Sequence, residues 1–388
     1  MALAGIGASL AALLLLPWLE LRPNRILEGA PVGAAAALGP WLALPLALLG
    51  LLACDALRRR RSPGLDLLAT TGAAAGLASL FVLAGPAATR LLAASASPTA
   101  RVSLGPGLWI ASLGLAVALF SANRRLAGRP GARALRALFS LAPILLVLAA
   151  GLAGLLDDLS LVRELAARRQ GFLLALGRHL FLSVSAVALG VAAGVPLALT
   201  MHRVRRLEPA AFLLINVAQV VPTLSLLGLL VAPLAALGNA VPVLGRAGVR
   251  GIGWAPALIV LFLYSLLPIA GNTLAGLRTV APDVLDAARG MGMDRRQVFR
   301  RVEVPLALPV LLSGVRTALV QNIGNAILAA LVGGGGLGTL IFLGLAQASP
   351  DLILLGALSV AGLALASDRI LEAAVRLAAP RGLRRGPA

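Results

Sequence analysis

The chain has 388 residues, of which 59% are hydrophobic and 13% are charged, and its mean hydropathy is +0.95. This composition excludes an ordinary soluble domain and is typical of a polytopic membrane protein. The 34 basic residues, all arginine, exceed the 15 acidic residues and give a formal net charge of +19. Nucleic-acid binding would need a basic face with stacking aromatic side chains. Aromatic residues make up only 4% of the chain, so we exclude nucleic acid as a partner.

Apolar segments of about 20 residues recur along the chain, and each is long enough to cross a lipid bilayer. They predict an all-α fold with about ten transmembrane helices. The first segment lacks a basic leader and is expected to stay as a membrane anchor. The predicted spans are residues 2–19, 33–53, 66–85, 107–121, 137–156, 178–200, 209–236, 254–276, 304–331 and 351–375.

The arginines concentrate in every second connection between these spans, as the positive-inside rule requires of cytosolic loops. The predicted cytosolic groups are Arg58–Arg61, Arg124–Arg136, His202–Arg206, residues 282–305 and the tail that ends at Arg385. Residues 20–32, 86–106, 157–177 and 237–253 then face the outside, and both termini are cytosolic. Alternatively, Arg163–His179 forms an amphipathic helix at the membrane surface.

The chain divides into two parts near Asp157 and Asp158. Residues 1–160 form a predicted N-terminal transmembrane extension of Ala-, Leu- and Gly-rich helices. This extension is either a regulatory or binding module, or a packing module that shapes the complex. Residues 173–378 contain every recognisable motif. Cys54 is the single cysteine, which excludes an intrachain disulfide, and we expect it to be a small buried hydrophobic residue.

Polar side chains in two of the predicted spans are candidates for lining a translocation path. Pro222 removes a backbone hydrogen bond inside its span, which is tolerated where neighbours or a water-filled cavity satisfy the freed carbonyl. The candidates are Asn216, Gln219, Pro222, Thr223, Ser225, Gln321, Asn322 and Asn325. Each can instead connect packed helices by hydrogen bonds. Residues 333–336, all glycine, predict a flexible loop at the mouth of the path.

The charged segment from Pro282 to Pro305 predicts two short helices joined by a bend. Proline suits the first position of a helix, because its missing N–H has no partner there. Gly292 permits the sharp bend. Asp294, followed three residues later by Gln297, predicts a capping box at the start of the second helix. The segment is therefore expected to be a rigid cytosolic knob suited to docking into another protein.

The same segment resembles the EAA loop in the permease subunits of ATP-binding-cassette importers. The family pattern is Glu-Ala-Ala, three residues, Gly, nine residues and Ile-x-Leu-Pro. Here Asp286-Ala287-Ala288, Gly292 and Val302-Glu303-Val304-Pro305 stand at this spacing. The resemblance implies a type I permease core of about five helices within residues 173–378. It also implies contact with an ATPase at Asp286, Ala287, Ala288, Gly292 and Pro305.

Three further stretches resemble the importers of quaternary-amine osmoprotectants such as glycine betaine, carnitine and choline. They are Val221–Gly228, Leu266–Leu277 and Gly290–Met293. That subgroup usually has an arginine directly before the Asn-Thr pair, where this chain has Gly271. The resemblance implies a bacterial inner membrane location and three protein partners. These are a cytosolic ATPase, a periplasmic or lipid-anchored substrate-binding protein, and a second permease copy or homologue.

The sequence also bears on whether the chain is an enzyme and on which other transport functions it could have. The chain has no Walker sequence, so we expect a non-enzymatic subunit that binds no cofactor and relies on ATP hydrolysis by its partner. An amino-acid importer is the alternative within the family. A secondary transporter would need intramembrane charges, for which Asp368 and Arg369 are the candidates. A membrane enzyme would need a metal or nucleophile cluster; His179 and His202 are instead expected to be solvated or interfacial.

The predicted topology can be tested with reporter fusions. Fusions after Arg61, Arg296 and Pro387 should report a cytosolic location, and a fusion after Gly245 should report an external one, because the arginine-rich connections remain inside. The measurement is the ratio of a cytosol-active to a periplasm-active reporter. An external signal at Arg296 would contradict both the topology and the docking role of residues 282–305.

Overall fold

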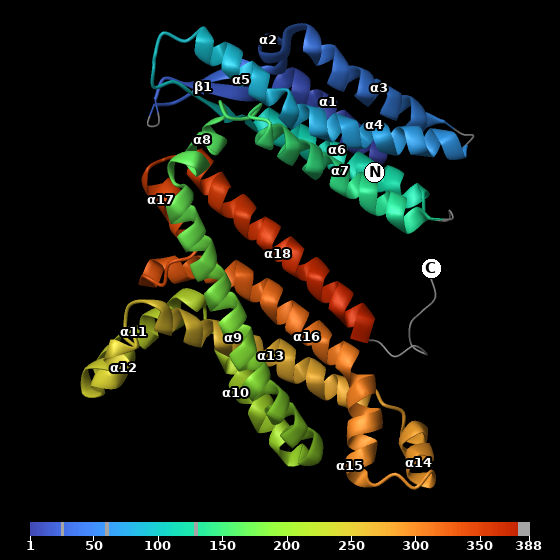
Figure 1. Cartoon of the computed structure of the whole chain (residues 1–388), viewed down its shortest axis with the longest axis vertical. Helices are drawn as coiled ribbons and strands as arrows, with labels where there is room; N and C mark the ends of the chain where they lie inside the picture. The colour runs from blue at the N-terminus through green and yellow to red at the C-terminus, as the bar shows by residue number, and fades with distance from the viewer. Residues whose placement is uncertain (25–26, 59–61, 128–130, 379–388) are drawn as a thin grey trace. The chain divides into compact units, whose positions relative to one another are not determined.

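The computed structural model describes residues 1–24, 27–58, 62–127 and 131–378. Arg59–Arg61, Arg129 and the arginines of the tail, which the topology prediction uses, lie outside the described residues. The chain divides into two compact units, and Figure 1 shows the elements of both. Unit 1 consists of Met1–Ala167 and Gln347–Asp351, and unit 2 of Arg168–Ala346 and Leu352–Ala388.

Unit 1 contains eight α-helices, a short 3₁₀ helix and three β-strands among the described residues. Its helices are α1 (Ala2–Leu15), α2 (Ala34–Leu38), η1 (Gly39–Leu42), α3 (Ala43–Leu57), α4 (Pro63–Val82), α5 (Ala84–Ala93), α6 (Pro106–Arg125), α7 (Ala132–Leu152) and α8 (Ser160–Ala167). Its strands are β1 (Pro17–Arg22), β2 (Ala30–Gly33) and β3 (Arg101–Leu104).

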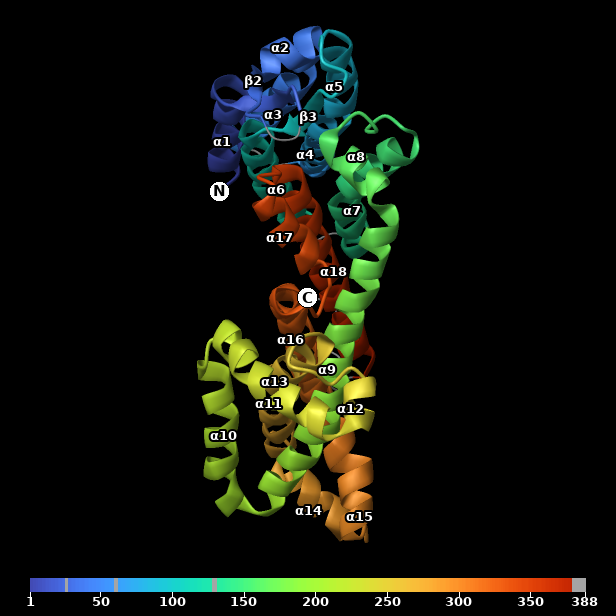
Figure 2. The same ribbon diagram turned by 90° about the vertical axis from the view of Figure 1, so that its left-hand side faces the viewer.

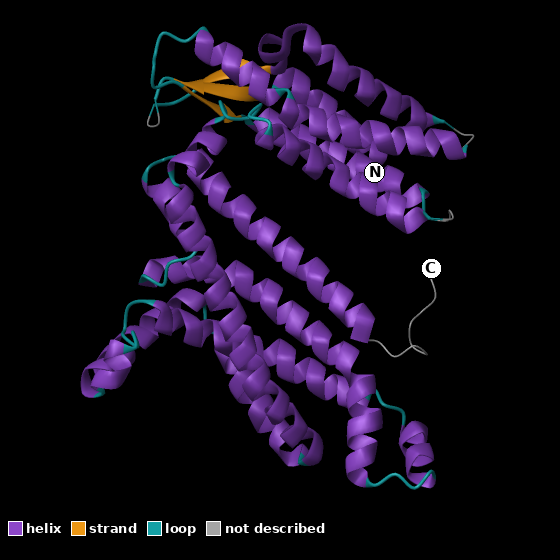
Figure 3. Ribbon diagram, viewed as in Figure 1, coloured by secondary structure: helices purple, strands orange, loops and turns teal. Residues whose placement is uncertain are grey.

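The three strands form a small antiparallel sheet in the order β2-β1-β3, drawn in orange in Figure 3. The predicted helix over residues 2–19 is therefore wrong at its end, since α1 stops at Leu15. Pro17 lacks the N–H that would continue the helix, and Trp18 and Leu19 are buried in the sheet. β3 lies within the predicted outer connection 86–106, and β2 begins in the predicted outer connection 20–32 and ends one residue beyond it. β1 leads into the connection 20–32.

Small residues bring two helices of unit 1 into close contact. A Cβ atom on Gly5 of α1 would lie 2.5 Å from the carbonyl oxygen of Gly114 in α6. Ser9 Oγ donates a hydrogen bond to the carbonyl oxygen of Ala111 at 2.8 Å across the same interface. Glycine and serine at such a crossing are typical of helices that associate within a membrane.

Cys54 is exposed on α3, so the prediction that it is buried is wrong. An apolar side chain is expected to be buried inside the protein only when the protein is surrounded by water. A helix in a bilayer can present apolar residues to lipid, which is as apolar as a protein core. Its neighbour Asp55 accepts a hydrogen bond from Arg125 of α6, with the two atoms 2.6 Å apart. This ion pair connects α3 and α6 near their ends.

A buried polar cluster of unit 1 includes residues from distant parts of the sequence. Asp351, which is 4% exposed, accepts a hydrogen bond from Ser103 of β3 at 2.7 Å. Glu164 of α8, which is 1% exposed, accepts one from Arg101 at 2.7 Å. Polar groups removed from water need such partners. The bond from Ser103 connects Asp351, in the segment Gln347–Asp351, to the rest of unit 1.

Unit 2 consists of α-helices, three 3₁₀ or π segments and connecting loops among its described residues. The elements are α9 (Arg169–Arg203), η2 (Arg205–Leu207), α10 (Glu208–Val220), α11 (Thr223–Ala240), α12 (Pro242–Arg246), α13 (Trp254–Arg278), α14 (Pro282–Gly290), α15 (Arg295–Val298), η3 (Phe299–Glu303), α16 (Val304–Asn325), η4 (Ala326–Val332), α17 (Gly338–Ala346) and α18 (Pro350–Ala378), of which η3 is a π-helical turn and α18 begins in unit 1.

Helices α9, α13 and α16 pack against one another at the centre of unit 2, as Figures 1 and 2 show. A Cβ atom on Gly190 of α9 would lie 2.6 Å from Cβ of Ser265 in α13. One on Gly314 of α16 would lie 2.4 Å from the carbonyl oxygen of Pro268. Any larger side chain at these two positions would push the helices apart, so glycine determines how closely α9 and α16 approach α13.

Nine helices of the described residues are long and apolar enough to cross a membrane, and α1 is a shorter apolar helix. These ten segments confirm the predicted all-α polytopic fold. The predicted span 209–236 differs in one respect, because it is broken into α10 and α11 at Val221 and Pro222. Val221 has an extended backbone conformation, and Pro222, with φ −55° and ψ 137°, is not helical. Pro222 also has no N–H to donate to a helix.

Tyr264 of α13, which is 4% exposed, fastens this break. Its hydroxyl donates to the carbonyl oxygen of Val221 at 2.8 Å and accepts from Thr223 Oγ1 at 3.1 Å. Its backbone carbonyl accepts from Gln219 Nε2 at 2.7 Å. The carbonyl freed by the broken helix is thus satisfied by a side chain, as an apolar environment requires.

The start of α10 is fastened to α13 by an ion pair. The Glu208 carboxylate accepts hydrogen bonds from the two terminal nitrogens of Arg278 at 2.9 and 2.5 Å. These hydrogen bonds from Arg278 lower the pKa of Glu208 below its ordinary value. Helix α10 is therefore tied to α13 at both ends, by Glu208 and by Tyr264.

Replacing Tyr264 with phenylalanine should lower the stability of the purified protein. The change leaves the Val221 carbonyl and the Thr223 hydroxyl without their partner, which costs about 1–3 kcal/mol for buried groups. The measurement is the midpoint of thermal unfolding in detergent. Thr223→Val is the matched control and should give a smaller shift, because it retains the bond from Tyr264 to Val221. Equal midpoints for Tyr264→Phe and wild type would contradict this role.

Candidate functional site

The charged segment of residues 282–305, named here the coupling segment, follows α13 and leads into α16. Helix α14 begins with Pro282 near its first position, as the sequence predicts. Ala288 is 2% exposed and Val298 is also 2% exposed, so each short helix buries one apolar side chain. Figure 1 shows α14 and α15 side by side at one end of unit 2, where Arg278 ends α13 and Val304 begins α16.

The bend between α14 and α15 depends on Gly292 and Asp294. Gly292 has φ +82°, a left-handed conformation that side chains disfavour. Asp294 Oδ1 accepts a hydrogen bond from the backbone N–H of Gln297 at 2.7 Å. The backbone N–H of Asp294 donates to Gln297 Oε1 at 3.0 Å. These two bonds confirm the predicted capping box.

The second short helix does not end before the membrane, which corrects the expectation of two separate short helices. Helix α15 continues through the π-helical turn η3, from Phe299 to Glu303, into α16. Pro305 is near the start of α16 and cannot donate to the carbonyl four residues earlier. A wider turn directly before the proline accommodates that missing bond. The coupling segment is therefore continuous with a long apolar helix.

The outer surface of the coupling segment combines apolar and charged side chains. Met291 is 72% exposed, and Val284 is 42% exposed. Asp286 is also exposed and forms an i,i+3 ion pair with Arg289 at 2.8 Å. Such an exposed pair contributes little stability. A large exposed methionine beside charged residues is suited to an interface with another protein.

The polar residues near the α10–α11 break have two different surroundings. Gln219 and Thr223 are partly buried and bonded to Tyr264. Asn216, Pro222 and Ser225 are exposed on the surface of unit 2. The structure therefore brings Gln219 and Thr223 together, and leaves the other three on an open face. Sequence inspection missed Tyr264, although it is the single tyrosine of the chain.

The three amides near the end of α16 also differ in their surroundings. Asn322 is 0% exposed, and its Nδ2 donates to Ser265 Oγ at 2.7 Å and to the carbonyl oxygen of Leu261 at 3.1 Å. It connects α16 to α13 and does not line an open surface. Gln321 and Asn325 are partly exposed. These two are the amides of α16 that remain accessible in unit 2.

An ion pair connects two membrane helices of unit 2. Arg316 of α16 donates to both carboxylate oxygens of Asp368 in α18, at 2.6 and 2.7 Å. The sequence had indicated Asp368 and Arg369 as the candidate intramembrane pair. Arg369 instead lies near Glu372 at 3.5 Å. A bidentate arrangement neutralises both charges of the Arg316–Asp368 pair, which reduces their cost in an apolar environment.

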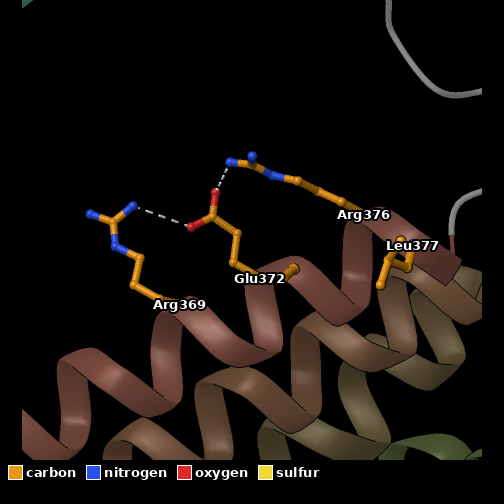
Figure 4. Close-up of a pocket in the computed structure, with 5 residues that line it drawn as sticks. Arg369, Glu372, Arg376 and Leu377 are labelled. Carbon is orange, nitrogen blue, oxygen red and sulfur yellow. Dashed lines mark hydrogen bonds and ion pairs between the residues drawn. The ribbon is translucent and has the colours of Figure 1, made fainter. Parts of the chain in front are cut away.

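An open hollow of about 370 Å³ lies at the end of α18. Figure 4 shows Glu372 between Arg369 and Arg376, which come from successive turns of the same helix. Such pairs are common on exposed helix surfaces and contribute little to stability. This hollow contains none of the predicted path residues.

The two histidines differ in their surroundings. His202 is partly exposed. His179 is 0% exposed, so the expectation of a solvated or interfacial imidazole is wrong for this residue. Both of its ring nitrogens are within hydrogen-bonding distance of backbone atoms. In the described part of the chain, no three His, Cys, Asp or Glu side chains gather as they would to hold a metal ion.

Two family models match different parts of the chain. Residues 186–381 match the binding-protein-dependent transport system inner membrane component, which covers half of the chain. Residues 1–162 match the N-terminal domain of the ABC transporter permease YehY. The first match contains the coupling segment and all the candidate path residues.

Curated relatives match about half of the chain. The chain is 37% identical to the glycine betaine/carnitine/choline transport system permease protein OpuCB of Bacillus subtilis. It is 38% identical to the choline transport system permease protein OpuBB of Bacillus subtilis. It is 36% identical to the osmoprotectant import permease protein OsmW of Salmonella typhimurium. Each match covers 207 residues, 53% of this chain and 88–91% of the relative.

These relatives are permease subunits, which are not themselves catalytic. The part of this chain that the first family model matches contains several helices that are long and apolar enough to cross a membrane. The chain therefore belongs to the family of binding-protein-dependent transport system inner membrane components, and it is a multi-pass protein of that membrane.

Proposed function

We propose that this chain forms the membrane path of an ATP-driven importer for a small quaternary-amine osmoprotectant such as glycine betaine or choline. The observation that carries the substrate class is the likeness to relatives whose names include these compounds, at 36–38% identity over 88–91% of their length. The match to the family model, over residues 186–381, includes both sides of the α10–α11 break and the coupling segment.

A separate cytosolic ATPase supplies the energy and docks on the coupling segment. Two features support this partner. The segment is rigid, because the capping box and Gly292 determine its bend. Its outer surface exposes the apolar side chains of Met291 and Val284. Contact with another protein would remove these side chains from water. The residues that we assign to this contact are Asp286, Ala287, Ala288, Gly292 and Pro305. Ala288 is buried and contributes by packing α14 against the rest of the segment.

The continuity of α15, η3 and α16 gives the coupling segment a mechanical role. A displacement of α15 by the ATPase is passed directly along one helical rod, which extends from Arg295 to Val332. A hydrogen-bonded rod transmits such a displacement better than a flexible loop would. Gln321 and Asn325, near the far end of α16, belong to the proposed path and lie on the same rod.

A second permease copy or homologue is the proposed partner of the face formed by α10 and α11. This face exposes Asn216, Pro222 and Ser225 beside large apolar side chains such as Val220, which is 80% exposed. Amide and hydroxyl groups facing lipid would lack hydrogen-bond partners. A water-containing path between two permease subunits would satisfy them. An external binding protein delivers the substrate, and the chain itself binds no cofactor.

Replacing Gly292 with valine should uncouple transport from ATP hydrolysis. Valine is strongly disfavoured at φ +82°, so the bend of the coupling segment must change. In liposomes containing the full complex, both transport and substrate-stimulated ATP hydrolysis should fall at least about tenfold, which corresponds to about 1.4 kcal/mol. Assembly of the complex is measured on the same samples.

Gly290→Ala is the matched control. Gly290 is the last residue of α14 and has open space around the position of a Cβ atom. Alanine also favours helix more than glycine. This variant should transport at the wild-type rate. Normal coupling in Gly292→Val, with Gly290→Ala also normal, would show that the bend is not required for contact with the ATPase.

The substrate class is tested with the complete complex in liposomes. Glycine betaine or choline should accumulate only when ATP, the ATPase and the binding protein are all present. The purified permease alone should have no strong affinity for either compound, since the binding protein selects the substrate. ATP-driven uptake of methionine or another amino acid alone would retain the importer and change its substrate. Uptake driven by an ion gradient without ATP would overturn the importer.

A further inference from the structure

His179 of α9 connects two separate segments through its ring. The ring Nε2 is 2.9 Å from the carbonyl oxygen of Ile323, and Nδ1 is 3.3 Å from the backbone nitrogen of Leu337. A carbonyl only accepts a hydrogen bond, and a backbone N–H only donates one. The proton must therefore be on Nε2, and Nδ1 must accept. This geometry selects the neutral Nε2–H tautomer of the imidazole.

The preceding residue, Arg178, holds the same loop. Its Nε donates to the carbonyl oxygen of Gly334 at 3.2 Å, and its guanidinium lies over the ring of Phe181 at 5.7 Å. Residues 333–336 are here named the glycine loop. Two consecutive side chains of α9 thus contact Gly334 within this loop and Leu337 directly after it. The glycine loop follows η4, which continues α16.

The glycine loop is shaped to fit against these two side chains. Gly333, Gly335 and Gly336 have φ values of +72°, +76° and +92°. A Cβ atom on Gly336 would lie 3.1 Å from His179 Nδ1, and one on Gly335 would lie 3.2 Å from Cγ of Arg178. Glycine is therefore needed for both the backbone conformation and the close approach of α9. In the structure the glycine loop is in contact with Arg178 and His179, and its flexibility stays a prediction.

We propose that Arg178 and His179 form a latch on the glycine loop, and that His179 is a positioning residue for transport. The role in transport rests on the proposed function, whereas the latch itself does not. Through Ile323 and Leu337, the imidazole joins the end of α16, the glycine loop and α9. The accessible amides Gln321 and Asn325 flank Ile323 along α16. The latch therefore determines where the end of α16 lies relative to α9.

A latch made of hydrogen bonds can open without unpacking a helix. Breaking the bond to Leu337 removes one of the two side-chain contacts from α9 to this region, and the neighbouring glycines then have more backbone conformations at little cost. Transport requires the ends of the path to open and close, and loops that do so generally depend on a few such contacts. An apolar residue at position 179 would fill the same space but would leave the Leu337 N–H and the Ile323 carbonyl unpaired.

Thiol labelling tests the latch directly. The reporter is Leu337→Cys, because Leu337 is 0% exposed and becomes accessible only when the glycine loop moves. It is placed in a Cys54→Ser background, since Cys54 is exposed and would react as well. The probe is a maleimide, applied to membranes without ATP or substrate. The measured quantity is the rate of labelling.

Two substitutions separate the two hydrogen bonds of the imidazole. The amide oxygen of His179→Asn stands near the place of Nδ1 and can still accept from Leu337. The amide of His179→Gln reaches the place of Nε2 and can still donate to Ile323, but it leaves Leu337 unpaired. We expect His179→Gln to label about tenfold faster than wild type, the factor for one lost hydrogen bond. His179→Asn should label near the wild-type rate.

The order of the two variants distinguishes the latch from simple packing. Glutamine is closer to histidine in volume than asparagine, so packing alone predicts that His179→Gln is the milder change. That order, or equal labelling of all variants, would overturn the latch. Arg178→Ala provides a second test at an exposed residue, where misfolding is less of a concern. It should also accelerate labelling, and an unchanged rate would remove Arg178 from the latch.

A transport measurement then tests the positioning role. In the complete complex, His179→Gln should reduce uptake about as strongly as it accelerates labelling, and His179→Asn should restore most of the uptake. If labelling follows the predicted order but the wild-type complex transports no osmoprotectant, the proposed function fails and the latch stands. If the wild type transports and His179→Gln transports equally well, the positioning role is wrong.

Discussion

Backbone N–H and C=O groups inside a lipid bilayer must find their hydrogen-bond partners within the protein, and two irregular parts of unit 2 meet this requirement in the same way. Where Pro222 interrupts the helix between α10 and α11, the Tyr264 hydroxyl takes the freed Val221 carbonyl. Where α16 ends, the His179 ring takes the carbonyl of Ile323 and the N–H of Leu337. In both places, a single buried polar side chain from a neighbouring helix replaces missing helical hydrogen bonds.

The helices of unit 2 differ in how much of their surface is packed against the rest of the unit. Tyr264 and Glu208 hold α10 to α13 near the two ends of α10. The helix otherwise buries little of itself, with Ile215 its one buried residue. The centre of the unit is different, because α9, α13 and α16 approach closely at Gly190 and Gly314. We therefore regard α9, α13 and α16 as the closely packed centre of the unit, and α10 and α11 as the part that the proposed second permease would cover.

Charge is distributed according to the same constraint. In the membrane helices of unit 2, Arg316 and Asp368 neutralise each other in a bidentate pair. The exposed charges of the coupling segment lie beyond the apolar part of α16, where water is available to solvate them. This separation allows one continuous helix to have a polar end for a soluble protein and an apolar part for the lipid. It also explains why the coupling segment could be recognised as a charged island in an apolar sequence.

Local features of the sequence determined much of this protein. The apolar periodicity predicted the all-α polytopic fold, and Pro282, Gly292, Asp294 and Gln297 predicted the coupling segment down to its capping box. These features depend on contacts within a few residues, or on the thickness of the bilayer, and can be deduced without the fold. The EAA-like spacing also led to the family that the comparisons show.

The tertiary structure alone decided which polar residues are buried and what they bind. Asn322 and Gln321 are neighbours in sequence, yet one connects two helices and the other remains partly exposed. The bonds of His179 join residues separated by 144 and 158 positions. The three-stranded sheet likewise pairs β1 with β3 across residues far apart in the chain. Such pairings depend on which helix faces lie together, and in an apolar sequence many arrangements bury similar surfaces, so hydrophobic pattern cannot distinguish among them.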